Sequence, residues 1–99
     1  MVFFCGCQPC AELARALGPD RLANADVYFR GSEGDAREFQ KRHRLTRTVQ
    51  ADENGTIALR YGVQTCPSVV LPGRGVIGNG RVLKDTDLVQ VAHALEEGS

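Results

Sequence analysis

The stretch VFFCGCQPC, residues 2–10, decides the fold of this chain. Val2–Phe4 is a short apolar run of residues that favour β-structure, which predicts a buried strand. From Pro9 onward the pattern becomes helical, and proline suits a first helical turn because its missing N–H would have no partner there. The cysteines Cys7 and Cys10 therefore lie where a strand ends and a helix begins.

The start of a helix changes the chemistry of a cysteine. Backbone N–H groups without partners and the positive end of the helix dipole favour the thiolate over the thiol. We therefore expect Cys7 to be the attacking nucleophile near neutral pH. Cys10 lies about one turn further along, within reach of an intramolecular disulfide that would resolve a mixed disulfide at Cys7. A C-x-x-C in this context is typical of a redox site, and two inert buried thiols or half of a zinc site remain as alternatives.

Beyond this stretch, strand-like and helix-like segments alternate along the chain. We expect strands at residues 2–4, 27–29, 48–50, 68–71, 76–77 and 81–83, and helices at residues 9–17, 33–43, 56–61 and 86–96. Gly18-Pro19-Asp20 is expected to stop the first helix, and Ser32 with Asp35 matches a capping-box pattern before the second. Short strands joined by helical crossovers predict an α/β fold with parallel strands and an antiparallel edge.

Length and charge argue against several classes of protein. The chain has 99 residues, which is the size of one domain, and we expect residues 1–99 to form it. Its 12 basic and 12 acidic residues give a formal net charge of zero, which argues against a nucleic-acid partner. No apolar run approaches the roughly 18 residues of a membrane span, and no signal peptide precedes the first strand. We expect a monomer that binds neither nucleic acid nor membrane, and without a signal peptide the cytoplasm is the default location, with a shortened form of an exported protein as the alternative.

Three stretches together resemble the thioredoxin-like superfamily, most closely its redoxin branch of thiol–disulfide oxidoreductases. They are residues 2–10, ALRYGV at residues 58–63 and TCPSVVL at residues 65–71. The resemblance implies a central mixed sheet flanked by helices, in an N-terminally short version of the fold because the family's usual first strand is missing. It also implies that Pro67 is a cis-proline opposite the C-x-x-C.

The resemblance also implies a function and a set of site residues. Cys7 and Cys10 would be the catalytic pair of a thiol–disulfide oxidoreductase that acts through a mixed-disulfide intermediate. The backbone at Thr65, Cys66 and Pro67 would bind an extended protein substrate by strand addition. That substrate would be a protein disulfide or dithiol, and no cofactor would be needed.

Cys5 and Cys66 raise a second possibility. If Pro67 faces the C-x-x-C, all four cysteines would converge, and four thiolates suffice for tetrahedral zinc or an iron–sulfur cluster. Alternation along the strand argues against this convergence, because it would send Cys5 to the opposite face of the sheet from its strand neighbours. Cys5 would then be a small buried core residue, and a third redox thiol is the remaining alternative.

Other patterns are weaker. Residues 73–78 match the glycine pattern of a dinucleotide site, but such a site needs a helix to begin there, and the following residues indicate a hairpin. His43 and His93 have no ligand-like spacing to a partner, so we assign them no catalytic or metal-binding role. A local run of basic residues is expected on an exposed helix face: Arg37, Lys41, Arg42 and Arg44.

Overall fold

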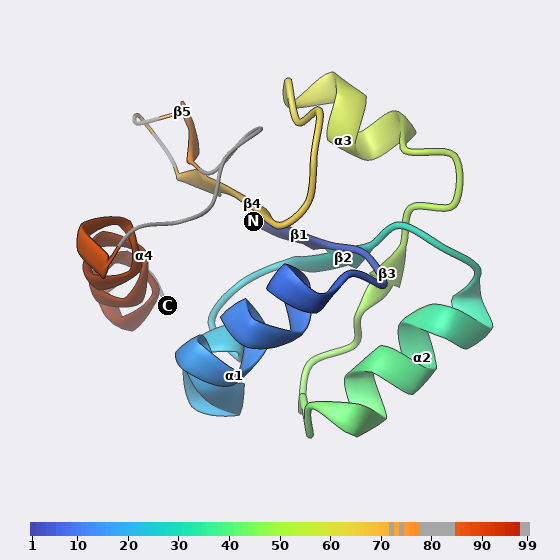
Figure 1. The fold of residues 1–99 in the computed structure, drawn as a ribbon, viewed down its shortest axis with the longest axis horizontal. Helices are drawn as coiled ribbons and strands as arrows, with labels where there is room; N and C mark the ends of the chain where they lie inside the picture. The colour runs from blue at the N-terminus through green and yellow to red at the C-terminus, as the bar shows by residue number, and fades with distance from the viewer. Residues whose placement is uncertain (72, 74, 78–84, 98–99) are drawn as a thin grey trace.

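The computed structural model describes residues 1–71, 73, 75–77 and 85–97. Within these residues the chain forms five strands and four helices (Figure 1). In chain order they are β1 (Val2–Phe4), α1 (Gln8–Leu22), β2 (Val27–Phe29), α2 (Glu33–Arg42), β3 (Gln50–Ala51), α3 (Thr56–Arg60), β4 (Ser68–Leu71), β5 (Gly75–Ile77) and α4 (Asp85–Glu97). The expected strand at residues 81–83 lies outside the described residues.

The strands form one mixed sheet. Its order is β3-β2-β1-β4-β5, so the strand before the C-x-x-C is the central one. β1 pairs in parallel with β2, and β2 with β3, whereas β4 runs antiparallel to both β1 and β5. The prediction of an α/β fold with parallel strands and an antiparallel edge is therefore confirmed for the described residues.

The two faces of the sheet are covered differently. Figure 1 shows α1 and α2 on one side of the strands and α3 on the other. Successive side chains of a strand point to opposite faces. In β1 this brings Phe4 to Phe39 of α2, with ring centroids 4.9 Å apart, and Phe3 to Tyr61 at the end of α3, 6.4 Å apart. The main core lies on the α1 and α2 face, because the buried cluster there includes Phe4 and Phe39.

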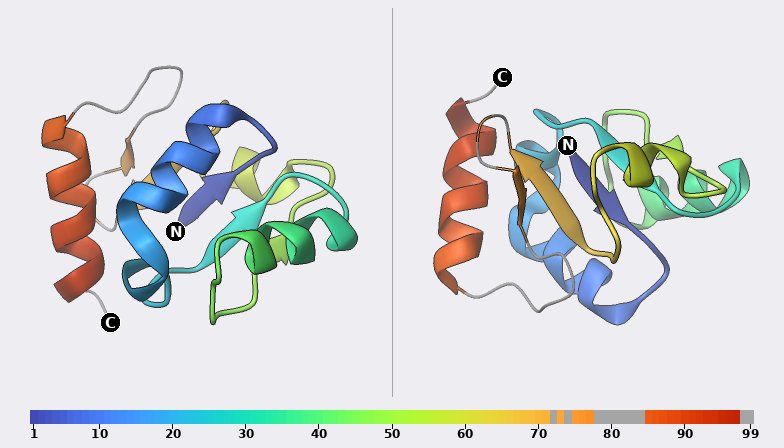
Figure 2. Two further views of the ribbon diagram at one scale, coloured as in Figure 1. Left: turned by 60° about the horizontal axis from the view of Figure 1, so that its bottom comes forward. Right: turned by 90° about the horizontal axis from the view of Figure 1, so that it is seen from above.

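The C-terminal helix α4 closes the core beside α1, as both views in Figure 2 show. Its buried residues Val91 and Leu95 belong to the main core cluster. At the surface, Arg21 of α1 forms an ion pair with Glu96 at 2.9 Å, and Asn24 Nδ2 donates a hydrogen bond to the Leu95 carbonyl at 3.1 Å. Among the described residues, every helix is too short or too polar to cross a bilayer.

The first helix breaks where we expected it to stop, and one further helical turn follows the break. Gly18 leaves helical geometry, with φ 78° and ψ 162°, so the break is where the sequence placed it. However, Pro19 opens a further turn, where proline is well tolerated, and that turn ends at Leu22. The predicted break at Gly18 is confirmed, and the further turn was not expected; it forms because it buries Leu22 in the same core as Leu17.

The second helix begins as predicted. Ser32 Oγ accepts a hydrogen bond from the Asp35 amide at 3.1 Å, and the Ser32 amide donates to Asp35 Oδ2 at 3.4 Å, which completes a capping box. The strand after this helix is displaced from the expected residues 48–50 to Gln50–Ala51. The reason is that the Val49 amide donates to the Gln40 side chain, at 3.0 Å, instead of joining the sheet.

The strands expected on either side of the turn at residues 72–75 are confirmed as β4 and β5, whereas the hairpin expected from residues 76–77 to residues 81–83 extends outside the described residues. β4 and β5 pair antiparallel, with Val69 opposite Ile77. Gly73 and Gly75 both have φ near 80°, which favours glycine at these two positions. A strand follows Gly75 where a dinucleotide site would need a helix, so the dinucleotide interpretation stays rejected.

Candidate functional site

Cys7 is the N-cap residue of α1. Its backbone is extended (φ −95°, ψ 160°), and its side chain makes no capping hydrogen bond to the helix. The Ala11 amide donates to the Cys7 carbonyl at 3.3 Å, so the helical bonding starts at this residue. The sulfur therefore lies at the positive end of the helix dipole while it remains available to other partners.

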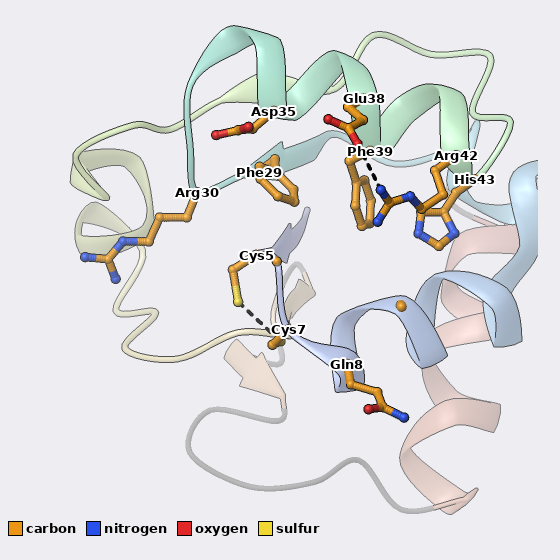
Figure 3. Close-up of a pocket in the computed structure, with 12 residues that line it drawn as sticks. Cys5, Cys7, Gln8, Phe29, Arg30, Asp35, Glu38, Phe39, Arg42 and His43 are labelled. Atoms are coloured by element: carbon orange, nitrogen blue, oxygen red, sulfur yellow. Dashed lines mark hydrogen bonds and ion pairs between the residues drawn. The ribbon is translucent and has the colours of Figure 1, made fainter.

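An open groove of about 610 Å³ leads to Cys7 (Figure 3). Its floor includes Cys5 and Cys7, and its opposite wall is formed by α2 and the end of β2. That wall carries side chains of both charges: Arg30, Asp35, Glu38 and Arg42. A volume of this size falls within the range of small-ligand sites, so a side chain or a short peptide segment has room to reach the Cys7 sulfur.

Cys10, in contrast, faces the interior and is fully buried, at 0% exposure. The Cys7 thiol donates to Cys10 Sγ at 2.9 Å, and the Cys5 amide donates to the same sulfur at 3.2 Å. Burial, and after it the hydrogen bond with Cys7, raise the pKa of the Cys10 thiol to about 12, although the Cys5 amide acts in the opposite direction. Cys10 is therefore a neutral thiol at neutral pH, whereas Cys7 is the exposed member of the pair.

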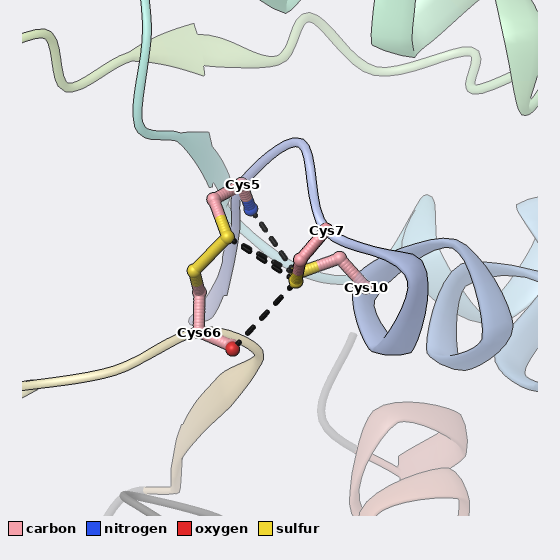
Figure 4. A group of neighbouring side chains, drawn as sticks. All are labelled: Cys5, Cys7, Cys10 and Cys66. Atoms are coloured by element: carbon pink, nitrogen blue, oxygen red, sulfur yellow. Dashed lines mark hydrogen bonds between the residues drawn. A yellow bond between two sulfur atoms is a disulfide. The ribbon is translucent and has the colours of Figure 1, made fainter.

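The pairing of β1 with β4 brings two distant cysteines together. In the antiparallel register, Phe3 lies opposite Ser68. Cys5 lies two residues after Phe3, and Cys66 lies two residues before Ser68. In an antiparallel pair the same register therefore places Cys5 opposite Cys66. These two residues form a disulfide, with Cα atoms 6.0 Å apart (Figure 4).

The interpretation of Cys5 as a small buried core residue is therefore wrong. Strand alternation does not apply to it, because β1 ends at Phe4 and the chain bends at Gly6. Because Cys5 lies outside the strand, its side chain is free of the strand's alternation and forms a disulfide with Cys66, which precedes β4. It is partly exposed and lines the groove beside Cys7.

All four cysteines converge, and their Sγ atoms lie within 4.8 Å of one another. Cys5 Sγ is 3.3 Å from Cys7 Sγ and 3.7 Å from Cys10 Sγ. Zinc in a Cys₄ site is bound at about 2.3 Å, which separates the sulfurs by about 3.8 Å. The cluster therefore has the dimensions of a metal site, but metal ligation needs thiolates and thus a reduced Cys5–Cys66 pair. As it stands, with one disulfide and two thiols, it suits thiol–disulfide exchange.

The residues expected to bind substrate lie directly beside the sulfur cluster. The Cys66–Pro67 peptide bond is cis, which is the isomer that the resemblance implies. The Cys66 carbonyl oxygen is 3.8 Å from Cys7 Sγ. Ser68 Oγ donates to the Thr65 carbonyl at 2.7 Å, which fixes the turn before β4. Of the three residues, Cys66 therefore borders the same sulfur, Cys7, that the groove exposes, and Thr65 and Pro67 are its neighbours in the chain.

The two histidines lie apart from this chemistry. His43 packs its ring on Phe39, with centroids 4.5 Å apart, at the far end of the groove from the sulfurs (Figure 3). Its pKa is lowered, first by burial and then by the nearby charges of Arg42 and Arg15, so the neutral ring is favoured. His93 is exposed on α4. The basic run of α2 is also exposed, as expected for residues Arg37, Lys41, Arg42 and Arg44.

Two features of the site were missed by sequence reasoning. One is the Cys5–Cys66 disulfide, which only the register between β1 and β4 reveals. The other is the charged wall of the groove, since Arg30, Asp35 and Glu38 carry no motif of their own. The sequence did hold a signal for the disulfide. Cys5 directly follows the strand predicted at residues 2–4, and Cys66 lies two residues before the strand predicted at residues 68–71.

Comparisons with family models, with curated proteins and with solved structures found no match for this chain. The function of this chain is therefore inferred from its own sequence and geometry.

Proposed function

We propose that this chain is a thioredoxin-like thiol–disulfide oxidoreductase in which Cys7 attacks and Cys10 resolves. The observation that carries the proposal is the asymmetry of the C-x-x-C pair. Cys7 is partly exposed at a helix N-terminus, on an open groove, while Cys10 is buried with its sulfur 2.9 Å away. In this arrangement the Cys7 sulfur can contact a substrate, whereas the Cys10 sulfur can react only with Cys7.

The reaction would proceed in two exchange steps. The Cys7 thiolate attacks one sulfur of a substrate disulfide, the substrate S–S bond breaks, and the other substrate sulfur leaves as a thiolate. Cys10 then loses its proton and attacks Cys7 Sγ, which releases the second substrate thiol and forms a Cys7–Cys10 disulfide. Two electrons pass to the substrate, and the reverse sequence would oxidise a substrate dithiol.

The high pKa of Cys10 suits its role as the resolving thiol. A neutral Cys10 does not compete with Cys7 for the incoming substrate disulfide, since the thiolate is the attacking species. Once Cys7 is part of a mixed disulfide, it no longer donates to Cys10 Sγ, and one cause of the raised pKa is removed. The Cys5 amide, which lowers the pKa of Cys10, would remain in place to stabilise the thiolate.

The edge formed by Thr65, Cys66 and Pro67 would align the substrate backbone. Strand addition places an extended substrate segment alongside the backbone, and this segment leads directly into β4. The mixed-charge wall of α2 lies across the groove from Cys7 and would contact the substrate's flanking side chains. The expected substrate is thus a protein disulfide or dithiol in an extended, exposed segment.

Reduction of a protein disulfide, with the fully reduced chain as the only reductant, tests the proposal. We expect Cys7→Ser to reduce no substrate above the uncatalysed rate, and Cys10→Ser to accumulate a mixed disulfide through Cys7. The double variant Cys5→Ser/Cys66→Ser is the matched control and should retain turnover, because it leaves the C-x-x-C pair intact. An unchanged rate in Cys7→Ser would show that the nucleophile is assigned wrongly.

A second candidate function is a metal or iron–sulfur site formed by Cys5, Cys7, Cys10 and Cys66. The convergence of the four sulfur atoms within 4.8 Å favours it. Elemental analysis and a visible absorption spectrum of anaerobically purified, reduced protein test it directly. One zinc ion or one cluster per chain, lost in Cys5→Ser/Cys66→Ser, would support this function. Metal-free protein that forms a Cys7–Cys10 disulfide would exclude it.

A further inference from the structure

The Cys5–Cys66 disulfide is in contact with the C-x-x-C pair. Cys5 Sγ lies 3.3 Å from Cys7 Sγ and 3.7 Å from Cys10 Sγ, distances close to van der Waals contact for two sulfur atoms. A disulfide that only cross-links a fold needs no thiol beside it. Here two thiols face one disulfide sulfur, and this is the arrangement that precedes exchange.

We propose that Cys5 and Cys66 are a second redox pair, which exchanges its disulfide with Cys7 and Cys10 within the chain. The inference goes beyond the proposed function, because the exchange needs no external substrate. It would hold even if the chain acted on no protein disulfide at all.

The exchange takes two steps and needs no added oxidant or reductant. The Cys7 thiolate attacks Cys5 Sγ, the Cys5–Cys66 bond breaks, and Cys66 leaves as a thiolate. Cys10 loses its proton and attacks Cys7 Sγ, the new Cys5–Cys7 bond breaks, and Cys5 leaves as a thiolate. The protons lost by Cys7 and Cys10 equal those gained by Cys5 and Cys66, and the disulfide has moved to Cys7–Cys10.

The local backbone permits the intermediate. A Cys5–Cys7 bridge spans a single residue, Gly6, which is exposed and whose added Cβ would meet nothing within 4 Å. The connection between the two sulfurs can therefore adjust without displacing packed side chains. The backbone turn that holds Cys66 is fixed separately by the hydrogen bond from Ser68 to Thr65, so only the Cys66 side chain has to move when its sulfur leaves.

The consequence is a chain that stores four electrons in two pairs. After Cys7 and Cys10 have reduced one substrate disulfide, a reduced Cys5–Cys66 pair would restore them by the reverse exchange. The fully reduced chain would then reduce two substrate disulfides before it needs an external reductant.

Disulfide mapping of the wild-type chain tests this inference. Trypsin cuts after Arg15, Arg60 and Arg74, so three cysteines fall on one peptide and Cys66 on another, residues 61–74. A Cys5–Cys66 bond links the two peptides, whereas a Cys7–Cys10 bond leaves them separate with Cys66 open to alkylation. Chains with one disulfide per molecule are prepared in two ways. The fully reduced form is treated with one equivalent of diamide, and the fully oxidised form is treated with one equivalent of dithiothreitol. EDTA is present throughout, and acid quenches the samples before alkylation.

We expect the linked fraction to reach the same intermediate value from both directions. The double variant Cys7→Ser/Cys10→Ser is the control and should be fully linked, because it has no thiol to exchange. The inference would be overturned if the fraction of linked peptides differed between the two starting forms. It would also be overturned if every wild-type molecule carried the linked peptides. In Cys10→Ser we expect alkylated Cys66 as well, since Cys7 displaces it from Cys5, and a fully linked Cys10→Ser would disprove that first step.

Discussion

At the scale of single residues, Cys10 shows how strongly its surroundings control a thiol. Its side chain is fully buried, and its pKa is raised to about 12 from an ordinary 9.0, chiefly by that burial. A neutral thiol does not react with alkylating reagents, because the thiolate is the nucleophile. The same shift connects Cys10 to folding stability. Its contribution is fully present below pH 9.0 and is lost as the pH rises towards 12, since only the unfolded chain releases this proton in that window.

We therefore predict a pH-dependent order of alkylation in the chain with an intact Cys5–Cys66 disulfide. At pH 7 to 9, iodoacetamide should label Cys7, and labelling of Cys10 should stay near background until the pH approaches its raised pKa. Short pulses of reagent, followed by mass spectrometry of the disulfide-linked peptides 1–15 and 61–74, measure the two rates. Equal labelling of Cys7 and Cys10 at pH 7 would contradict the buried, neutral state of Cys10.

Asp52 is a residue that no sequence motif marked, yet it is 4% exposed and organises the start of α3. Its two carboxylate oxygens accept hydrogen bonds from the amides of Ile57 at 3.1 Å and Ala58 at 2.9 Å. Asp52→Ala should lower the free energy of unfolding by about 1–3 kcal/mol, because two partly buried amides lose their partners. The neighbouring exposed Glu53 gives a matched control, and Glu53→Ala should change stability by less than about 0.5 kcal/mol in urea unfolding. Equal effects of the two substitutions would exclude a capping role for Asp52.

At the scale of elements, the chain offers a matched pair of glycines with opposite requirements. Gly18 breaks α1 with φ 78° and ψ 162°, a conformation almost restricted to glycine, although a Cβ there would meet nothing within 4 Å. Gly34 lies in the first turn of α2, and its Cβ would meet only Ser32 Oγ at 3.7 Å. Backbone conformation, and not space, therefore distinguishes the two positions.

We predict that the same substitution has opposite signs at these two glycines. Gly18→Ala should destabilise the fold by about 1–2 kcal/mol through backbone strain. Gly34→Ala should stabilise it by about 0.5 kcal/mol, because alanine loses less entropy in a helix. The midpoints of urea unfolding of both variants and the wild type measure the change in stability, provided that the free energy of unfolding depends on urea with the same slope in all three. A stabilised Gly18→Ala would mean that α1 is continuous through this residue.

Most elements could be predicted from the sequence because their signals are local. The capping residues Ser32 and Asp35 define the start of α2, and the apolar runs at residues 2–4 and 27–29 define two core strands. The predicted bounds of elements are wrong where a contact between residues distant in the sequence determines where the element begins or ends. The turn that ends at Leu22 forms because it completes the core, and β3 begins late because Gln40 captures the Val49 amide.

At the scale of the whole molecule, the site depends on a pairing that no local pattern contains. Cys7 and Cys10 could be predicted as a pair because they lie three positions apart at the start of a helix. Cys5 and Cys66 could not, because their contact follows from the register of β1 against β4, across 61 positions of sequence. The same register places the turn at Thr65 beside Cys7, so the sheet determines both the second disulfide and the expected substrate edge.

The last prediction concerns the stability that this long connection provides. Closing a loop of 61 residues should stabilise the fold by about 4 kcal/mol, because it restricts the unfolded chain. The variant Cys7→Ser/Cys10→Ser isolates this bond, and its oxidised form should unfold at higher urea than its reduced form, with a smaller slope because its unfolded state is more compact. Cys5→Ser/Cys66→Ser, with Cys7 and Cys10 oxidised, closes only a short loop and should gain about 2 kcal/mol. If oxidation stabilised both variants equally, loop length would not be the cause, and the cross-link between β1 and β4 would act through the folded state instead.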